Sequence, residues 1–308
     1  MAMQSRYIYS GTKEHPVYVD CVKASHSSGK WPIVMLHGGF HNGSAYLSTP
    51  DGRDGWADEF ARRGHDVFVM DWPGHGRSPS SACFVDLSML DVGRSLGVLL
   101  SEIGPAIVFA HSASGPIAWW VAENFSTFVK AVVGIAPGAP ANLVPVLEIG
   151  NFGNAGANNT EGNPIISASD RPAYVDRDFI LKFWANSPRF PHQAFESYAR
   201  SIGHESPRIL NERFNIGASG LYLEKPEKLK DLPILIITGE LDPRHPREMD
   251  GALAQFLGAD FIWLPDLGIR RNGHMLMIED NHIEIAGHIG CWLDSKVCPS
   301  SNGLRQMG

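Results

Sequence analysis

The stretch IVFAHSASGPIAWW, residues 107–120, decides the fold. An apolar run ends abruptly at His111 and Ser112, and small residues follow before a bulky apolar segment resumes. This order is typical of a buried strand, a sharp turn and a helix, with Pro116 near the helix start, where proline is favourable. The pattern predicts a serine hydroxyl exposed at the end of a strand, between residues small enough for strand and helix to close around it.

Around this stretch, short apolar runs alternate with helix-like segments. The predicted strands of the first half are 18–22, 32–36, 66–70, 106–110 and 131–135. The predicted helices are 55–63, 87–102 and 116–125. Such alternation indicates a mostly parallel sheet, and continuous apolar runs indicate strands that are covered on both faces.

The alternation stops after residue 135 and returns near residue 233. The intervening chain is first rich in Gly, Pro and Asn, and from about 176 to 214 it has helix-like stretches with aromatic residues. Strand-like runs at 233–238 and 260–264 and a helix over 281–296 complete the pattern.

We therefore predict an α/β fold with a mostly parallel sheet of about eight strands and helices on both faces. Residues 1–137 and 229–308 would form the core domain, and residues 138–228 an inserted helical cap. A cap over the sheet fits this fold class, because ligands bind at the carboxyl ends of parallel strands.

Ser112 occupies the nucleophile position of the pattern G-x-S-x-G, which in this chain reads AHSAS. Ala110 and Ser114 replace the two glycines, and both are still small. A hydroxyl alone is a weak nucleophile, so it needs a base, and the base needs an orienting carboxylate.

Asp242 and His274 are the candidates for these partners. Asp242 lies just after the predicted strand 233–238, and His274 lies on a Gly-containing loop before the last helix. In folds with the G-x-S-x-G turn, the catalytic residues follow one another along the chain in the order serine, acid, histidine. Parallel strands also bring their carboxyl ends to one edge of the sheet, where these residues can meet. Glu240 is the nearest alternative acid, and Asp266 is a more distant one.

The sequence HGGF, residues 37–40, follows the predicted strand 32–36 and offers backbone N–H groups to the same edge. Gly39 or Phe40, together with Ala113, would form an oxyanion hole. The sequence does not separate Gly39 from Phe40.

Five short motifs together resemble the successive signatures of the α/β-hydrolase superfamily, in its serine esterase-like branch. They are LHGGF (36–40), DWPGHGRS (71–78), AHSASG (110–115), TGELDP (238–243) and NGHML (272–276). The resemblance covers roughly residues 30–295 apart from the cap. It implies Ser112 as nucleophile, His274 as general base and acid, and Asp242 as orienting carboxylate, with no cofactor and no metal. A serine at the nucleophile position argues against the haloalkane dehalogenases, which use aspartate there.

Several neighbouring residues are expected to be structural. His37 and His111 adjoin the motifs and are expected to fix the backbone by hydrogen bonding. Residues 71–76 are expected to form a structured loop after strand 66–70. Trp119 and Trp120 follow the turn and are expected in the core.

Phe179, Phe183 and Trp184 share one face of a predicted cap helix. Such a face can simply dock a helix onto the body. It can also line a substrate pocket, in which case the substrate is fairly apolar, and we take these three residues as candidate substrate-binding residues.

Composition excludes other classes of function. The chain has 308 residues, is 44% hydrophobic and has a formal charge of −7, so a nucleic-acid partner is not expected. No apolar run reaches the about 18 residues of a membrane span, and the first residues do not read as a signal peptide. Four cysteines without CxxC spacing indicate free thiols in a reducing compartment, so a cytoplasmic location is expected, without a Cys291–Cys298 disulfide. No metal-binding motif is present.

These observations predict a serine hydrolase that cleaves an ester or lactone bond of a small, fairly apolar molecule. The same fold and triad could act on a carbon–carbon or amide bond, or as a lyase. A receptor-like ligand-binding protein with little turnover and a scaffolding role are the alternatives of another class. Substrate identity, stereoselectivity and oligomeric state stay open.

Overall fold

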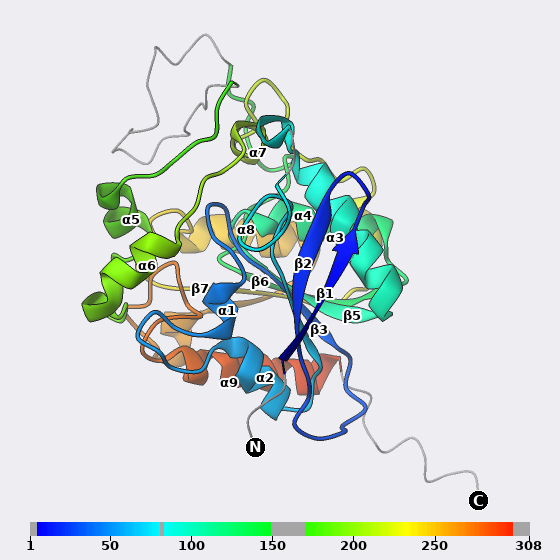
Figure 1. Ribbon diagram of the computed structural model, residues 1–308. Helices are drawn as coiled ribbons and strands as arrows, with labels where there is room; N and C mark the ends of the chain where they lie inside the picture. The colour runs from blue at the N-terminus through cyan, green and yellow to red at the C-terminus, as the bar shows by residue number, and fades with distance from the viewer. Residues whose placement is uncertain (1–4, 81–82, 149–169, 298–308) are drawn as a thin grey trace, which may run out of the picture.

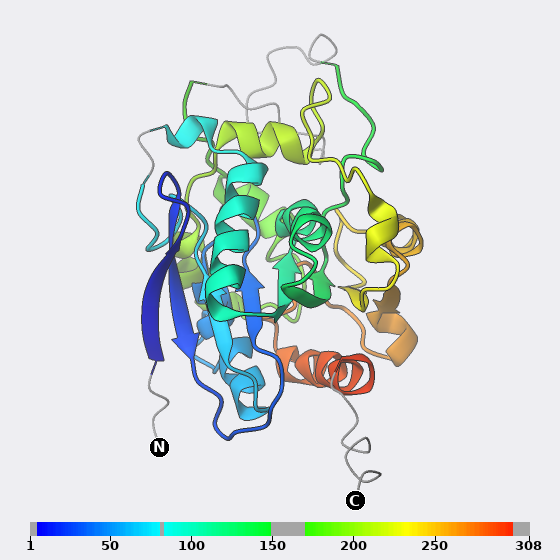
Figure 2. The same ribbon diagram turned by 90° about the vertical axis from the view of Figure 1, so that its right-hand side faces the viewer.

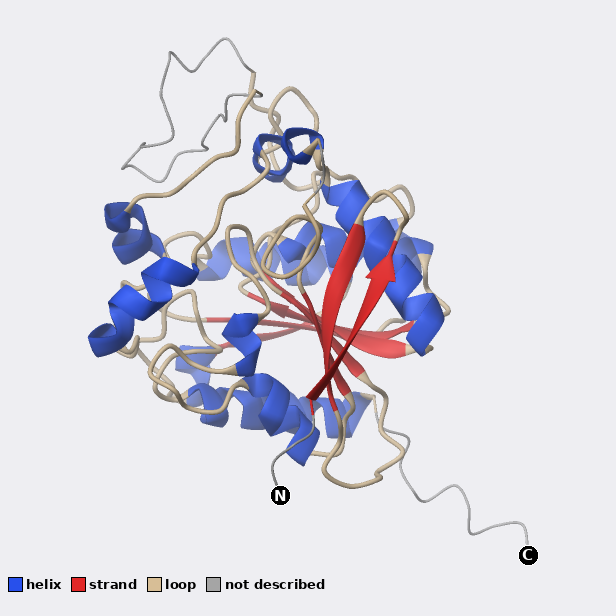
Figure 3. Ribbon diagram, in the orientation of Figure 1, coloured by secondary structure: helices blue, strands red, loops and turns tan. Residues whose placement is uncertain are grey.

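One eight-stranded sheet lies at the centre of the molecule in a computed structural model, which describes residues 5–80, 83–148 and 170–297 (Figure 3). The strands are β1 (Ser5–Gly11), β2 (Pro16–Val22), β3 (Ile33–Leu36), β4 (Val67–Met70), β5 (Ala106–His111), β6 (Val129–Ile135), β7 (Ile234–Thr238) and β8 (Asp260–Trp263). Their spatial order is β1-β2-β4-β3-β5-β6-β7-β8. β1 pairs antiparallel with β2, and β2 pairs antiparallel with β4, whereas all other neighbours are parallel. Figure 2 shows the β1–β2 pair, in dark blue, at one side of the molecule.

The central strands are buried on both faces. Along β3, Ile33 and Met35 belong to one apolar cluster, while Val34 and Leu36 belong to the other. Successive side chains of a strand point to opposite faces, so a strand between two cores reads as a continuous apolar run. The apolar runs therefore predicted this sheet correctly.

Helices cover both faces. They are α1 (Ser44–Leu47), α2 (Trp56–Arg62), α3 (Met89–Ile103), α4 (Ser114–Asn124), α5 (Arg177–Phe183), α6 (Phe195–Ser201), α7 (Pro207–Arg213), α8 (Arg247–Leu257) and α9 (His282–Lys296), with 3₁₀ turns η1 (Phe84–Asp86), η3 (His192–Ala194), η4 (Pro226–Leu229) and η5 (Leu264–Leu267). Apolar side chains of α3, α4 and α8 form one cluster with the sheet, and those of α2 and α9 join the other (Figure 1). The mostly parallel sheet with helices on both faces is thus confirmed.

The elements that the sequence did not predict include β1, α1 and α8. β1 is an edge strand whose Tyr7 and Tyr9 are exposed, so it lacks the apolar run that marks the central strands. α8 (Arg247–Leu257) buries a stripe that includes Leu253 and Leu257, but Gly251 and its charged residues obscure the helical pattern. No helix within the described ranges is long and apolar enough to cross a lipid bilayer.

The segment between β6 and β7 contributes α5, α6 and α7, and α5 and α6 lie together at the left of Figure 1. It contacts the loops that follow β3, β7 and β8. These contacts are hydrogen bonds from Gly203 N–H to Phe40 O at 2.8 Å, from Asn186 Nδ2 to Leu241 O at 2.7 Å and from Ser187 Oγ to Arg271 O at 2.7 Å. The segment therefore reaches the carboxyl ends of the parallel strands, whereas its division from the core at residues 138 and 228 stays a prediction.

Candidate active site

Ser112 lies at the turn between β5 and α4, with a backbone φ of 53°. This left-handed conformation is strained for a residue other than glycine. Hydrogen bonds hold it in place: Ser112 N–H donates to Ile135 O at 3.1 Å, and Ser112 O accepts from Gly115 N–H at 2.9 Å and Gly138 N–H at 2.7 Å. The turn thus lifts one hydroxyl-bearing side chain at the carboxyl end of β5.

The small residues around the turn are required by close backbone contacts. A Cβ added to Gly115 would lie 2.3 Å from Gly138 O, and one added to Gly38 would lie 2.9 Å from Ser112 Cβ. Ser114 is fully buried, and its hydroxyl donates to His37 O at 2.5 Å. Ser114 therefore replaces the usual glycine by making a hydrogen bond to the loop after β3.

Asp242 and His274 come together although 32 residues separate them in the chain. His274 Nδ1 lies 2.5 Å from Asp242 Oδ2, and both side chains are buried. An ionised carboxylate can only accept, so the Nδ1–H of His274 donates this bond and Nε2 is left as the acceptor of a neutral ring. Glu240, the alternative acid, instead contacts Arg270 and the backbone N–H of Arg271 near the surface.

The electrostatics of this pair suit a base. Burial raises the pKa of Asp242, but the imidazoles of His274 and His245 and the hydrogen bonds that it accepts outweigh burial and bring the pKa to about 2. Burial lowers the pKa of His274 below its ordinary value, although Asp242 opposes this shift. At neutral pH the pair is therefore a carboxylate beside a neutral imidazole that can take up a proton.

His111, which directly precedes Ser112, contacts His274. Its ring centroid lies 4.7 Å from that of His274, and its Nε2 lies 3.1 Å from His274 O. Among the described residues no hydrogen bond joins the Ser112 hydroxyl to His274. In free enzymes such bonds are often long and tighten when the substrate binds.

His37 is structural as expected, since its Nε2 accepts from Trp72 N–H at 3.0 Å.

Glu279 holds the loop that carries His274. Its carboxylate accepts from Gly273 N–H at 2.7 Å and from Asn272 Nδ2 at 2.5 Å, and the side chain is fully buried. Burial raises the pKa of Glu279 to about 7, although these hydrogen bonds oppose the shift. The loop position of His274 is thus set by a buried carboxylate that sequence reasoning did not single out.

Asp242, His245 and His274 each offer a potential metal-ligand atom, and these atoms lie within 4.8 Å of one another. Two histidines and one carboxylate can bind a transition metal. Here Asp242 and His274 are already joined by their 2.5 Å hydrogen bond, and His245 Nδ1 lies 3.1 Å from Asp250 Oδ1. A metal ion would have to replace the Asp242–His274 hydrogen bond, so the donor atoms fit a proton-transfer pair better than a metal centre.

The loop after β3 carries two candidate oxyanion donors, the backbone N–H groups of Gly39 and Phe40. Only the Phe40 N–H already has an acceptor. Phe40 N–H donates to the carboxylate of Glu205 at 3.0 Å. No hydrogen bond from Gly39 N–H or Ala113 N–H to another described residue is found. A Cβ added to Gly39 would lie 3.6 Å from the Ala113 Cβ, so the two backbones are close.

Glu205 is a second residue that sequence reasoning missed. It is fully buried, and its Oε1 lies 3.1 Å from His75 Nε2. Burial lowers the pKa of His75, but the charge and hydrogen bond of Glu205 outweigh burial and raise it. Glu205 lies just before α7, in the segment between β6 and β7, and no motif in the sequence marks it.

The three aromatic residues predicted to bind substrate lie in one cluster. Phe179 packs against Phe183 with ring centroids 4.7 Å apart and against Trp184 at 5.2 Å. The ring centroid of Trp184 in turn lies 4.6 Å from that of His41 and 5.8 Å from that of Phe40. The cluster therefore packs α5 onto the loop after β3, next to the candidate oxyanion donors.

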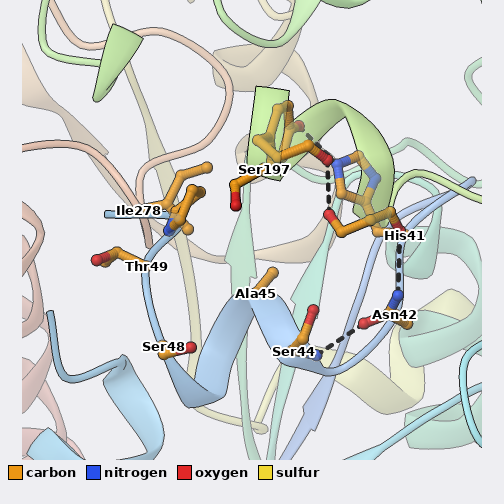
Figure 4. Close-up of a pocket in the computed structure, with 11 residues that line it drawn as sticks. His41, Asn42, Ser44, Ala45, Ser48, Thr49, Ser197 and Ile278 are labelled. Atoms are coloured by element: carbon orange, nitrogen blue, oxygen red, sulfur yellow. Dashed lines mark hydrogen bonds between the residues drawn. The ribbon is translucent and has the colours of Figure 1, made fainter. Parts of the chain in front are cut away.

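A cavity of about 210 Å³ opens on the far side of His41 (Figure 4). Figure 4 shows hydroxyl-bearing residues around it, including Ser44, Thr49 and Ser197. His41 and Tyr198 also line it, and His41 Nε2 lies 2.8 Å from the Tyr198 hydroxyl. Ser112 and His274 are not among the described residues that line it. The cavity thus lies beside the site and not within it.

Comparison with known proteins agrees with this fold. A model of the alpha/beta hydrolase family matches residues 33–287. A probable secreted lipase of Fungal sp. (strain ATCC 74256) is 23% identical, over 94% of this chain and 89% of its own. A thermophilic esterase from Thermogutta terrifontis superposes with a TM-score of 0.66 at 16% identity, covering 96% of this chain and 100% of its own. An N-acyl homoserine lactonase superposes with a TM-score of 0.65 at 16% identity, covering 96% and 98%.

Proposed function

Since the chain belongs to the alpha/beta hydrolase family, we propose that it is a serine hydrolase that cleaves an ester or lactone bond of a small molecule. The observation that carries this proposal is the buried Asp242–His274 hydrogen bond of 2.5 Å at the sheet edge where Ser112 is held in a strained turn. A neutral base oriented by a carboxylate is what a serine hydroxyl needs to become a nucleophile.

In the proposed reaction, Ser112 Oγ attacks the acyl carbon and His274 Nε2 takes the hydroxyl proton. Asp242 keeps His274 in the required tautomer and stabilises the imidazolium that forms. His274 then gives the proton to the leaving oxygen, which leaves an acyl-enzyme on Ser112. Water that His274 activates hydrolyses this ester and regenerates the hydroxyl.

We assign the oxyanion hole to the N–H groups of Gly39 and Ala113. Phe40 was the other upstream candidate, but its N–H is held by Glu205 at 3.0 Å. Two backbone donors beside the reacting carbonyl stabilise the developing negative charge, and one such donor typically contributes about 3 kcal/mol to barrier lowering.

We assign the acyl-binding wall to Phe179, Phe183 and Trp184, which pack beside Phe40. Their aromatic surface supports a fairly apolar substrate. The lipase, esterase and lactonase named above support an oxygen ester or lactone as the scissile bond. The cytoplasmic location predicted from the cysteines stays a prediction, since the fungal relative is named as secreted.

The test is labelling of the full-length protein with a fluorophosphonate, followed by peptide mapping. A single adduct on Ser112 is expected, and it should be lost or slowed at least about 10³-fold in the His274→Ala variant. His288→Ala, which changes a partly exposed histidine of α9, is the matched control and should label normally. Absence of an adduct with both this probe and a smaller sulfonyl fluoride, on folded protein, would contradict the proposal.

A panel of short-chain esters and lactones then measures turnover. Labelling without hydrolysis of any member would point to a receptor-like binding protein with an activated serine. Hydrolysis that disappears in Ser112→Ala would support the acyl-enzyme route.

A further inference from the structure

Two of the three guanidinium nitrogens of Arg244 are buried without a hydrogen-bond acceptor. Its Nε and Nη2 atoms are inaccessible to solvent and make no hydrogen bond within the described residues. The guanidinium lies over the rings of Phe183 and Phe179, at 4.3 and 5.2 Å from their centroids. Burial, together with the neighbouring charge of Arg213, lowers the pKa of Arg244 to about 10. Buried N–H donors without an acceptor are costly, so this arrangement favours an acceptor from outside the protein.

Arg213 supplies a second positive charge, near enough to lower the pKa of Arg244. It ends α7, and a Cβ added to Gly138 would lie 3.0 Å from its Cζ. Gly138 N–H donates to Ser112 O at 2.7 Å, so this guanidinium lies close to the nucleophile turn. Arg213 and Arg244 both interact electrostatically with Asp242.

Neither guanidinium forms an ion pair with a carboxylate in the described part of the chain. Nearby arginines at the surface behave differently. Arg247 Nη2 lies 2.6 Å from Asp266 Oδ2, and Arg270 Nη1 lies 3.2 Å from Glu240 Oε1. The lack of an ion pair at Arg213 and Arg244 is therefore specific to these two residues, and not a general property of arginines in this region.

We propose that Arg213 and Arg244 form an anion subsite that binds a carboxylate of the substrate, next to the Ser112–His274–Asp242 centre. This inference rests on the proposed hydrolase function and narrows its substrate class to esters or lactones of carboxylate-bearing molecules. An arginine fork binds a carboxylate through paired N–H···O bonds, and an anion between two cations also relieves their mutual repulsion.

The surroundings favour an organic acid over inorganic phosphate. Phe179 and Phe183 cover one face of the Arg244 guanidinium and provide apolar surface for a carbon chain. A monocarboxylate whose apolar part packs against these rings satisfies both the charge and the aromatic wall.

The experiment measures binding without turnover, so it is independent of whether the serine is active. Sodium hexanoate and its uncharged analogue hexanamide are titrated calorimetrically into the full-length protein. Hexanoate should bind at least about tenfold more tightly than hexanamide, because charge-assisted hydrogen bonds are made only by the anion. In Arg244→Gln and Arg213→Gln this preference should fall to about onefold.

Arg247→Gln is the matched control, since Arg247 is exposed and already paired, and it should keep the full preference. Circular dichroism melting checks that each variant folds, and Arg244→Lys, which keeps a charge, should retain part of the preference. Equal binding of hexanoate and hexanamide to the unaltered protein would overturn the proposal. So would a preference that survives in both glutamine variants, or phosphate binding more tightly than hexanoate.

Discussion

Ser112, the proposed nucleophile, is held by its backbone in an unusual conformation. A φ of 53° costs a side-chain-bearing residue roughly 1 kcal/mol, and three backbone hydrogen bonds to neighbouring segments hold it there. Two of these bonds anchor the turn to β6 and to the chain at Gly138. The hydroxyl consequently needs little rearrangement before it reacts, which is the advantage of a preorganised site.

Exchange of Asp242 for asparagine tests the acid of the triad. An amide cannot hold the His274 tautomer with Nε2 free, so Asp242→Asn should lower kcat for ester hydrolysis by about 10⁴-fold. Glu240→Gln, which alters the neighbouring surface carboxylate, should keep kcat within about threefold of the unaltered protein. Steady-state kinetics on one short-chain ester measures both, and a larger loss in Glu240→Gln than in Asp242→Asn would reverse the assignment.

The pH dependence of the reaction should follow His274. Burial lowers its pKa below the ordinary value of about 6.5, so the ring is neutral and competent as a base from that pH upward. We expect kcat/KM to be flat from about pH 6.5 to 8 and to fall with unit slope only on the acid side. Asp242, with a pKa of about 2, stays charged throughout. A fall that already starts above pH 7 would contradict a neutral buried base.

At the scale of elements, the turn between β5 and α4 is set by contact between two backbone segments. Gly115, the second residue of α4, lies against Gly138, which follows β6. Ala110 and Ser114 can replace the usual glycines because the closest approach has moved to Gly115. The requirement for a small residue is therefore kept, one position later in the chain.

Gly115→Ala should destabilise the protein, because its Cβ would lie 2.3 Å from Gly138 O, a backbone atom that cannot move alone. A loss of at least about 2 kcal/mol in the free energy of unfolding is expected, as for overpacked sites. Gly251→Ala in α8 is the control, since its Cβ would have room and alanine favours a helix by about 0.5–1 kcal/mol. Urea denaturation of the two variants measures both, and equal stabilities would refute the close-contact explanation.

At the scale of the whole molecule, Glu205 ties the segment between β6 and β7 to the core. Its carboxylate contacts Phe40 N–H on the loop after β3 and His75 on the loop after β4. It also accepts from Ser206 N–H at 2.8 Å. Glu205 thus joins the chain before α7 to the loops after β3 and β4, in addition to the hydrogen bonds made by Asn186, Ser187 and Gly203.

Removal of Glu205 should therefore loosen this connection. Glu205→Ala leaves a buried imidazole and two backbone N–H groups without an acceptor, so the free energy of unfolding should fall by about 3 kcal/mol or more. Glu196→Ala, at an exposed ion pair with Arg177, should change it by less than about 1 kcal/mol. Thermal or urea denaturation would show the contrast, and a Glu205→Ala loss as small as that of the control would exclude the docking role.

The same pair makes stability depend on pH. The pKa of His75 is raised in the folded protein, so its contribution to stability is complete below about pH 6.5 and is lost as pH rises through the folded-state pKa. The difference in free energy of unfolding between the unaltered protein and His75→Gln should therefore shrink from pH 6 to pH 9. A difference that grows with pH would contradict a raised pKa of His75 in the folded protein.

The central sheet and the order of the candidate triad could be predicted from the sequence, because both follow from local patterns. Strands buried on both faces must be apolar throughout, and catalytic residues at strand ends follow strands that can be recognised. The correctly predicted β5 and β7 placed Ser112 and Asp242 at one sheet edge. β1 was not predicted from the sequence, because an edge strand exposes polar and aromatic side chains and so has no continuous apolar run.

The sheet apart from β1, the turn at Ser112 and the candidates Asp242 and His274 could thus be predicted from the amino-acid sequence alone. Only the tertiary structure decided that Glu205 occupies the Phe40 N–H, and that the charges of Arg213 and Arg244 lie unpaired beside the site. The reason is physical: periodicity records whether a residue faces core or solvent, whereas a hydrogen bond or an unpaired charge depends on side chains from distant segments. Those contacts exist only once the chain has packed.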